Sequence, residues 1–327
     1  MNNSNGVEMK NGVTVCIPVF NEFERVERAI RSSASQCERL VVSDNASTDG
    51  TAEVCMRLQE EYENMEYVRQ SENIGALNNF RYLLEQVDTE FTLFLGSHDH
   101  IEGNFVQVLR DVLQEYPDTE IAAGSLIYES ESKLIPENLF NTWRGGELDT
   151  PEERVTACIF DRNYLGWANY GIFRTGTLKD AFLMHDDPPY GIDINLITRV
   201  AIRGKIRVSS ETRYYAWVRS KEDAENAPSY MERIVGHKRH ASKRKMRDDF
   251  CNVLFGIYTS TIGISSGFRY LNARYQFMVR NGVFKAQEPD YLYYLIYIPV
   301  KLARKLDRGS RFLRRTFHRI AGSERSA

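Results

Sequence analysis

The chain has 327 residues, of which 42% are hydrophobic and 27% are charged, and its formal net charge at pH 7 is -3. This length and hydrophobic content allow a sizeable folded core and exclude a largely disordered protein. The five cysteines lack the spacing of a zinc site and the density of a secreted disulfide framework, so the sequence favours a reducing cytoplasm. Residues 1–12 lack the basic start and apolar run of a signal peptide, and we expect a flexible leader there.

Short β-branched runs alternate with helical stretches over the first 126 residues. Strands are expected at residues 13–18, 39–44, near 67, 91–95 and 120–126, and helices at about 22–33, 51–61, 75–86 and 104–115. This alternation predicts an α/β fold with a mostly parallel central sheet covered by helices. Ligands of such sheets bind at the carboxyl ends of the strands, where Asn21, Asp44, Asn73 and Asp99 fall.

The pattern is less regular beyond residue 126. Residues 129–150 are polar and predict a loop, whereas residues 151–230 mix a helix with a turn-rich stretch at 167–173 and a strand at 212–218. Residues 250–300 are apolar and aromatic enough to form a helical bundle or hairpin.

The last 27 residues, 301–327, form a basic tail with nine Lys or Arg against two acids. Its apolar residues recur at roughly helical spacing, which is typical of a helix lying on an anionic membrane surface. The alternative is a solvated basic helix or an unstructured tail. The apolar run just before it, residues 291–300, is too short to cross a bilayer, which takes roughly 20 residues as a helix. No interleaved base-stacking pattern indicates a nucleic-acid partner.

Residues 94–100 end an apolar strand with one carboxylate, Asp99, between two imidazoles, those of His98 and His100. Such a cluster suits a divalent metal. The alternative is a polar loop tip whose histidines face water.

Three motifs follow one another at the ends of the expected strands: Ile17-Pro-Val-Phe-Asn-Glu22, Val41-Val-Ser-Asp-Asn-Ala-Ser-Thr-Asp-Gly-Thr51 and Asn73-Ile-Gly-Ala-Leu-Asn-Asn79. The series resembles the family 2 glycosyltransferases of the GT-A fold. In that family the first strand ends in a P-x-x-N-E-like motif, the second in D-x-S-x-D-G-T, and the third leads into an N-x-G loop. The resemblance is close over residues 13–103 and looser to about 220.

The resemblance implies a GT-A nucleotide-diphospho-sugar transferase fold. Residues 13–126 would form its nucleotide-sugar-binding half and residues 127–225 its acceptor-side half. We expect residues 226–327 to be a helical C-terminal extension that ends in the basic amphipathic tail.

The resemblance also implies a nucleotide site. Asp44 matches the family residue that accepts a hydrogen bond from a base ring N–H, and Glu22 matches the one that touches the nucleoside. The other residues that the resemblance places there are Pro18, Phe20, Asn73, Asn79 and Ser97. Either asparagine could instead cap a helix, while Asn21 is expected to brace its loop and Asp49 to shape the turn into the next helix.

The family's next motif, D-x-D, meets the ribose and a divalent metal that bridges the diphosphate, but Gly96 and His98 occupy its two acidic positions here. The resemblance therefore implies Mn²⁺ or Mg²⁺ held by Asp99, with His98 as a second ligand and with weakened affinity.

An inverting transfer also needs a general base, and Asp193 retains the carboxylate that the family places before a helix. Ile192 replaces the usual Glu, an N-cap role is the alternative for Asp193, and Asp186 and Asp187 are the fallback candidates. Trp167 and Tyr170 fall where the family lines the acceptor side, although either could be a core residue. Arg219 is a candidate for contact with the diphosphate.

The resemblance thus implies a glycosyltransferase that moves a sugar from a nucleotide-diphosphate donor, with a UDP-sugar favoured, to a hydroxyl of a saccharide or lipid-linked acceptor. We expect inversion, a role in cell-surface polysaccharide or glycan synthesis, and a cytoplasmic location peripheral to the inner face of the cell membrane. One alternative is an inactive nucleotide-sugar-binding or scaffold protein on the same fold. A nucleotidyltransferase is disfavoured because Phe20-Asn21-Glu22-Phe23 is not its Gly- and Lys/Arg-rich loop.

Overall fold

The computed structural model describes residues 9–130, 133–136, 145–160, 167–185 and 192–218, together with residues 253, 256 and 257. The chain divides into two compact units, residues 1–246 and 247–327. All helices and strands named below belong to the first unit.

Four parallel strands form one part of the sheet, in the order β3-β2-β1-β4. They are β1 (Lys10–Val19), β2 (Arg39–Asp44), β3 (Met65–Arg69) and β4 (Thr89–Phe94). The aliphatic side chains of β1 and β2 are buried, which explains why these strands read as continuous hydrophobic runs. The predicted strands and their parallel pairing are confirmed here.

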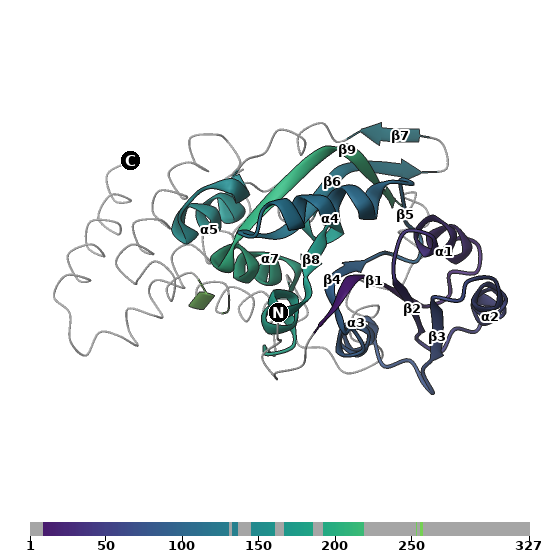
Figure 1. The fold of residues 1–327 in the computed structure, drawn as a ribbon. Coiled ribbons are helices and arrows are strands. Elements are labelled where there is room, and N and C mark those ends of the chain that lie inside the picture. Colours follow the sequence, from purple (N-terminus) through teal and green to yellow (C-terminus); the bar gives the residue numbers. More distant parts are fainter. Residues whose placement is uncertain are drawn as a thin grey trace, which may run out of the picture. The chain divides into compact units, whose positions relative to one another are not determined.

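Three helices connect these strands: α1 (Val26–Ala34), α2 (Thr51–Glu61) and α3 (Ala76–Glu85). The α1 and α2 helices pack against each other (Figure 1). The α3 connection runs back across the sheet from β3 to β4, so right-handed crossovers put α3 on the opposite face from α1 and α2. The helices thus cover the sheet, and the strand ends remain available to the loops.

The rest of the sheet departs from the expected order. The strand β8 (Ile172–Arg174) lies antiparallel between β4 and β6 (Thr119–Ser130), so the fourth and fifth predicted strands do not pair with each other. β6 then pairs in parallel with β9 (Lys205–Trp217), whose far part pairs with β5 (His100–Ile101). The helix α4 (Phe105–Glu115) packs on β6 and β9 (Figure 1). Because β8 comes from the second half of the chain, the two predicted halves share one sheet.

The loop predicted at residues 129–150 is wrong in part. β6 continues to Ser130 because its pairing with β9 runs on to Glu129 opposite Trp217, and β7 (Lys133–Pro136) then pairs antiparallel with β6. A short 3-10 helix, η2 (Gly145–Glu147), follows. The strand expected at 212–218 begins earlier, at Lys205, for the same reason of long pairing with β6.

The second half adds α5 (Pro151–Phe160), the 3-10 helix η3 (Trp167–Tyr170), α6 (Thr175–Phe182) and α7 (Ile192–Arg203). The buried guanidinium of Arg154 links α5 to the segment that precedes it and to α7. It donates hydrogen bonds to the carbonyls of Leu148 and Asp149 before α5 and to that of Ala201 in the last turn of α7. A cation there satisfies free carbonyls and complements the helix dipole.

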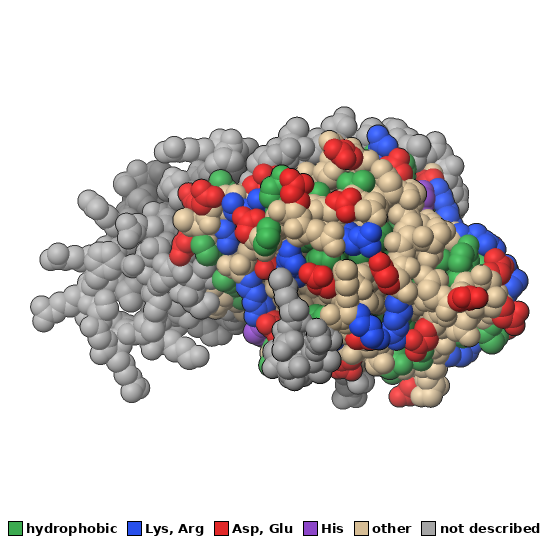
Figure 2. Space-filling view, viewed as in Figure 1, with side chains coloured by type: hydrophobic (Ala, Val, Ile, Leu, Met, Phe, Trp, Pro, Cys, Tyr) green, Lys and Arg blue, Asp and Glu red, His purple; other side chains and the backbone are tan. Residues whose placement is uncertain are grey.

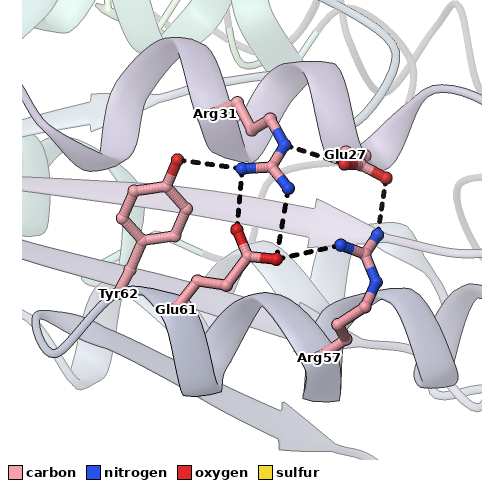
Figure 3. Close-up of polar contacts among 5 residues, drawn as sticks. All are labelled: Glu27, Arg31, Arg57, Glu61 and Tyr62. Atoms are coloured by element: carbon pink, nitrogen blue, oxygen red, sulfur yellow. Dashed lines mark hydrogen bonds and ion pairs between the residues drawn. The ribbon is translucent and has the colours of Figure 1, made fainter.

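Charged side chains of both signs are interspersed over the described face seen in Figure 2. Figure 3 shows one such group between α1 and α2: Arg31 and Arg57 each contact both Glu27 and Glu61, and Arg31 also donates to Tyr62. This network ties the two helices together at the surface. None of the helices in the described part of the chain is long and apolar enough to cross a membrane. The basic tail lies outside the described residues.

Candidate functional site

Hydrogen bonds lock the loops that follow β1 and β2 together. The Asn21 side-chain oxygen accepts a hydrogen bond from the backbone N–H of Thr48 at 2.8 Å. The backbone N–H of Asn21 donates to Ser47 Oγ at 2.9 Å. Asp49 accepts from Thr51 and from Phe23 N. Desolvation opposes the ionisation of Asp49, but these hydrogen bonds outweigh it and lower its pKa. Both residues therefore do the bracing and turn-shaping expected of them.

Asp44 ends β2 and is fully buried. Its Oδ1 accepts from Ser47 N at 2.8 Å, and its Oδ2 accepts from the Tyr67 hydroxyl at 2.7 Å with Arg69 at 3.7 Å. Burial and the Asp44 carboxylate raise the pKa of Tyr67, so this phenol stays protonated and donates. A base N–H could reach Asp44 only if the Tyr67 hydroxyl gave way, and contact with a base stays a prediction.

The two asparagines of the N-x-G loop are engaged within the protein. Asn73 accepts from Asn45 Nδ2 and from Gly75 N, both at 2.9 Å, while Asn79 is buried and exchanges hydrogen bonds with Ser43 on β2. These contacts fix the start of α3 to the end of β2. Neither asparagine is the helix cap that the sequence left open, because the N-cap of α3, Gly75, has no side-chain cap hydrogen bond and Asn79 lies within the helix. Their contact with a nucleotide remains a prediction.

The turn after β4 carries Asp99, which is only 4% exposed. The Asp99 Oδ2 accepts from the Tyr214 hydroxyl, and its Oδ1 accepts from Trp217 N, both at 2.8 Å. Its own N–H donates to Gly96 O at 3.0 Å, closing the turn. Burial raises the pKa of Asp99, although His98, Trp217 and Tyr214 oppose that rise. This carboxylate is therefore held from within the fold by β9.

Gly96 makes room for that carboxylate. A Cβ at position 96 would overlap Asp99 Oδ2 and lie 2.9 Å from Asp99 Cγ. The Gly96 N–H donates to the Tyr214 hydroxyl at 3.1 Å, so Tyr214 holds both ends of the turn. The first acidic position of the family motif could not carry any side chain while Asp99 keeps this conformation.

His98 lies between two carboxylates, those of Glu22 and Asp99, in the turn after β4. Its Nδ1 is 3.4 Å from Glu22 Oε1, and its Nε2 is 3.7 Å from Asp99 Oδ1. Arg25 lies 3.8 Å from Glu22 Oε2, and its guanidinium stacks over the Trp217 ring at 4.7 Å. The turn after β1, the turn after β4 and the end of β9 thus meet at one place.

The other predicted nucleotide-site residues lie on the loops around this place. Pro18 is near the end of β1, and Phe20 beyond it exposes 43% of its surface. Ser97 is buried in the turn after β4. Their contacts with a nucleotide are predictions.

The residues of this turn do not fit the divalent metal that the family implies. Among the described residues no three His, Cys, Asp or Glu side chains are grouped so that they could hold a metal ion. Mg²⁺ and Mn²⁺ prefer carboxylate and other oxygen ligands. The one carboxylate of the turn, that of Asp99, is buried with both oxygens accepting hydrogen bonds from β9.

The acceptor-side candidates lie on α7 and η3. Asp193 is in the first turn of α7, half-buried, and burial raises its pKa. Tyr170 packs on Tyr214, with 4.6 Å between ring centroids. Burial raises the pKa of Tyr170, and the charges of Asp99 and Asp193 raise it further, so this hydroxyl lies within electrostatic range of both carboxylates. The Trp167 side chain, Asp186, Asp187 and Arg219 lie outside the described part of the structure.

Three residues of the site were not predicted from the sequence: Tyr67, Tyr214 and Arg25. Tyr214 could have been noticed, because the strand-like segment at 212–218 alternates and places residues 214 and 216 on its buried side. The contacts of Tyr67 and Arg25 depend on pairing between distant strands, and no local pattern indicates them.

Comparison with known proteins gives the same fold. Residues 14–175 match the family model described as Glycosyl transferase family 2. The glycosyltransferase GlyA of Streptococcus pneumoniae is 28% identical over 124 residues, which are 37% of this chain and 18% of that protein. A Campylobacter jejuni GalNAc(5)-diNAcBac-PP-undecaprenol beta-1,3-glucosyltransferase is 28% identical over 129 residues, 38% of this chain and 41% of that protein. The aligned part thus spans less than half of either relative.

The fold also matches solved structures of S. aureus TarS. The one in complex with UDP-GlcNAc aligns with a TM-score of 0.60 and 18% sequence identity, over 88% of this chain and 79% of that chain. The likeness extends beyond the residues matched by the family model, and it confirms the predicted GT-A fold. The motifs after the first three strands, the sheet that places them at one edge and these comparisons agree, and this chain belongs to glycosyl transferase family 2.

Proposed function

We propose that this protein is a glycosyltransferase that moves a sugar from a nucleoside-diphosphate donor to a hydroxyl of a saccharide or lipid-linked acceptor, in polysaccharide or glycan synthesis. The observation that carries the proposal is the position of Tyr170, within electrostatic range of Asp99 beside the donor crevice and of Asp193 on α7. Carboxylates of the expected donor side and acceptor side thus both lie near Tyr170, which supports a site where two substrates meet.

Asp193 is the proposed general base. Burial raises its pKa toward the range in which a carboxylate accepts a proton effectively near neutral pH. As the acceptor oxygen attacks the anomeric carbon, Asp193 takes the hydroxyl proton. The bond from the anomeric carbon to the diphosphate oxygen breaks, and the nucleoside diphosphate leaves with the bonding electrons. Attack from the face opposite the leaving group inverts the anomeric centre.

The crevice between the turns after β1, β2 and β4 is the proposed nucleotide site. Asp44 at the end of β2 and Glu22 in the turn after β1 are the proposed acceptors for N–H and O–H groups of a nucleoside, and the buried Asp44 would have to become accessible for that contact. The TarS structure aligned above was solved with UDP-GlcNAc, and UDP is therefore the first nucleotide to test. The expected manganese or magnesium at Asp99 and His98 is not part of this mechanism, because the contacts of Asp99 do not fit it.

The test is release of the nucleoside diphosphate from a panel of UDP-, GDP- and dTDP-sugars by the full chain, with UDP affinity measured in parallel. Asp193→Asn should lower turnover at least about 100-fold and leave donor affinity unchanged. Asp111→Asn, the same substitution on the exposed side of α4, is the matched control and should keep full activity. Unchanged turnover in Asp193→Asn would remove Asp193 from the mechanism.

The same measurements separate the scaffold alternative. The scaffold alternative is based on the replacement of both acidic residues of the D-x-D motif, by Gly96 and His98. Binding of a nucleotide without turnover on any donor, with saccharide and undecaprenyl-linked acceptors supplied, would favour the scaffold. Absence of nucleotide binding would reject both functions.

A peripheral position on the inner face of the cell membrane is proposed from the sequence of residues 301–327, whose basic and apolar residues suit an anionic lipid surface. The full chain should co-sediment with phosphatidylglycerol vesicles at low salt, and a chain ending at residue 300 should remain in the supernatant. Equal sedimentation of both would refute the role of the tail.

A further inference from the structure

We propose that Asp99 is a positioning residue of the 96–99 turn, and that the nucleoside diphosphate binds beside His98 and Arg25 without a divalent ion held by the protein. This inference rests on the function proposed above, since it assumes a nucleoside-diphosphate donor. It differs from the expectation, drawn from the family resemblance, that Asp99 and His98 hold Mn²⁺ or Mg²⁺.

The first step is the direction of the Asp99 carboxylate. Both of its oxygens accept hydrogen bonds from β9, from the Tyr214 hydroxyl and the Trp217 N–H, at 2.8 Å each. A carboxylate with one charge-assisted hydrogen bond on each oxygen and 4% exposure is anchored in the protein. Each oxygen keeps a second lone pair, but at 4% exposure the carboxylate presents little surface to an ion outside the fold.

The second step is that the Asp99 side chain occupies the space that a side chain at position 96 would need. Asp99 Oδ2 fills the volume in which a side chain at position 96 would begin. The absence of the first family carboxylate and the inward turn of Asp99 are therefore one structural arrangement. A turn built in this way does not present two carboxylates to an ion, which is how Mg²⁺ and Mn²⁺ are usually held beside phosphates.

The third step is the pair of basic side chains at this place, Arg25 and His98, which lie among the carboxylates of Glu22, Glu24 and Asp99. The Arg25 guanidinium lies over the ring of Trp217 and within 3.8 Å of Glu22. The backbone N–H of Trp217 donates a hydrogen bond to Asp99. Its side chain is partly exposed, and guanidinium groups pair well with phosphate oxygens. The His98 imidazole, 40% exposed, is a further hydrogen-bond donor at the same place. An arginine held on an aromatic face near the turn can offset the charge of the leaving diphosphate.

The experiment is calorimetric titration of UDP into the full chain, in EDTA and in excess MnCl₂, for the wild type and four variants. Wild-type affinity for UDP should differ less than about threefold between the two buffers, and Arg25→Gln should lower it about tenfold in both. The partly exposed Arg110 on α4, which pairs with Glu38, supplies the control variant Arg110→Gln, whose UDP affinity should be unchanged.

Asp99→Asn and Tyr214→Phe separate a positioning role from metal binding. If Asp99 acts through Tyr214, both variants should weaken UDP binding by similar factors in EDTA and in manganese alike. UDP binding at least about tenfold tighter in manganese, with that gain lost in Asp99→Asn and kept in Tyr214→Phe, would overturn the inference and make Asp99 a metal ligand. Failure of UDP, GDP and dTDP to bind in either buffer would reject the proposed function, and this inference with it.

Discussion

Substitution of Gly96 by Ala tests directly whether the Asp99 carboxylate fills the space beside the Gly96 backbone. The backbone angle φ of Gly96 is not positive, so an alanine there meets no backbone strain. Its Cβ would overlap Asp99 Oδ2, and the carboxylate would have to rotate away from the Tyr214 hydroxyl. The cost is the lost hydrogen bond of a buried carboxylate together with local overpacking, about 2 kcal/mol of unfolding free energy.

A double-mutant cycle isolates that cost. Asp99→Ala alone destabilises the protein because it leaves the Tyr214 hydroxyl and the Trp217 N–H without their acceptor. In the Asp99→Ala background the clash at position 96 is gone, so adding Gly96→Ala should cost little. We therefore expect a coupling free energy of about 1–2 kcal/mol between the two positions, within the range found for residues in contact.

Urea unfolding at constant pH measures the four free energies of the cycle. Gly103→Ala serves as the control, because a Cβ there would have no atom within 4 Å and φ at Gly103 is not positive. It should change stability by less than about 0.5 kcal/mol. Additive effects of Gly96→Ala and Asp99→Ala would refute the contact, as would a Gly96→Ala protein as stable as the wild type.

The rate of transfer should fall as the pH drops through the raised pKa of Asp193, because the base is then protonated, and a pH–rate profile whose acidic limb lies at the ordinary carboxyl value of 3.8 would contradict the raised pKa. Arg154→Met should lower the unfolding free energy by about 3 kcal/mol in urea, since the carbonyls of Leu148, Asp149 and Ala201 lose a buried cationic donor; a change under about 0.5 kcal/mol would show that water replaces it. Arg31→Gln breaks the network between α1 and α2 (Figure 3), and any loss of thermal stability should be larger at low salt than in 1 M NaCl, because these side chains are partly exposed; a salt-independent loss would assign the effect to packing.

The parallel part of the sheet could be predicted from the sequence because each of its strands carries a local signal. Residues 39–44 form β2 with the expected bounds, and α4 begins and ends within a residue of its prediction. The antiparallel strand β8 has three residues and no periodicity of its own, so its insertion between β4 and β6 depends on pairing that no local pattern records. The loop predicted at 129–150 failed for the same reason.

The site shows the same division between local and distant causes. Asp49 shapes its turn through Thr51, two residues away, and the D-x-S-x-D-G-T pattern indicates that role. The orientation of Asp99 is decided by Tyr214 and Trp217, which lie 115 and 118 residues away along the chain. The sequence singled out the Asp99 carboxylate, but the partners that determine its direction come from the irregular half.

Among the described residues, Asp99 and Asp193 are carboxyl groups whose pKa is raised. Surface acids such as Glu27 and Asp88 have lowered pKa values, chiefly through hydrogen bonds from Arg31 and Lys10, whereas burial raises the pKa of Asp99 and Asp193. A carboxyl whose folded pKa exceeds its unfolded value contributes stability below the unfolded pKa, and that contribution is lost as the pH rises through the folded pKa.

Near neutral pH the ionised forms of Asp99 and Asp193 thus cost the fold stability, and packing and hydrogen bonds elsewhere must offset that cost. Groups held in this way concentrate at functional sites. Replacing Asp193 with Asn should then slow transfer and, unlike Asp99→Ala, leave stability unchanged or raised above the folded pKa. A clear destabilisation by Asp193→Asn would instead show that this carboxylate stabilises the first turn of α7, within which it lies one residue after the start of the helix.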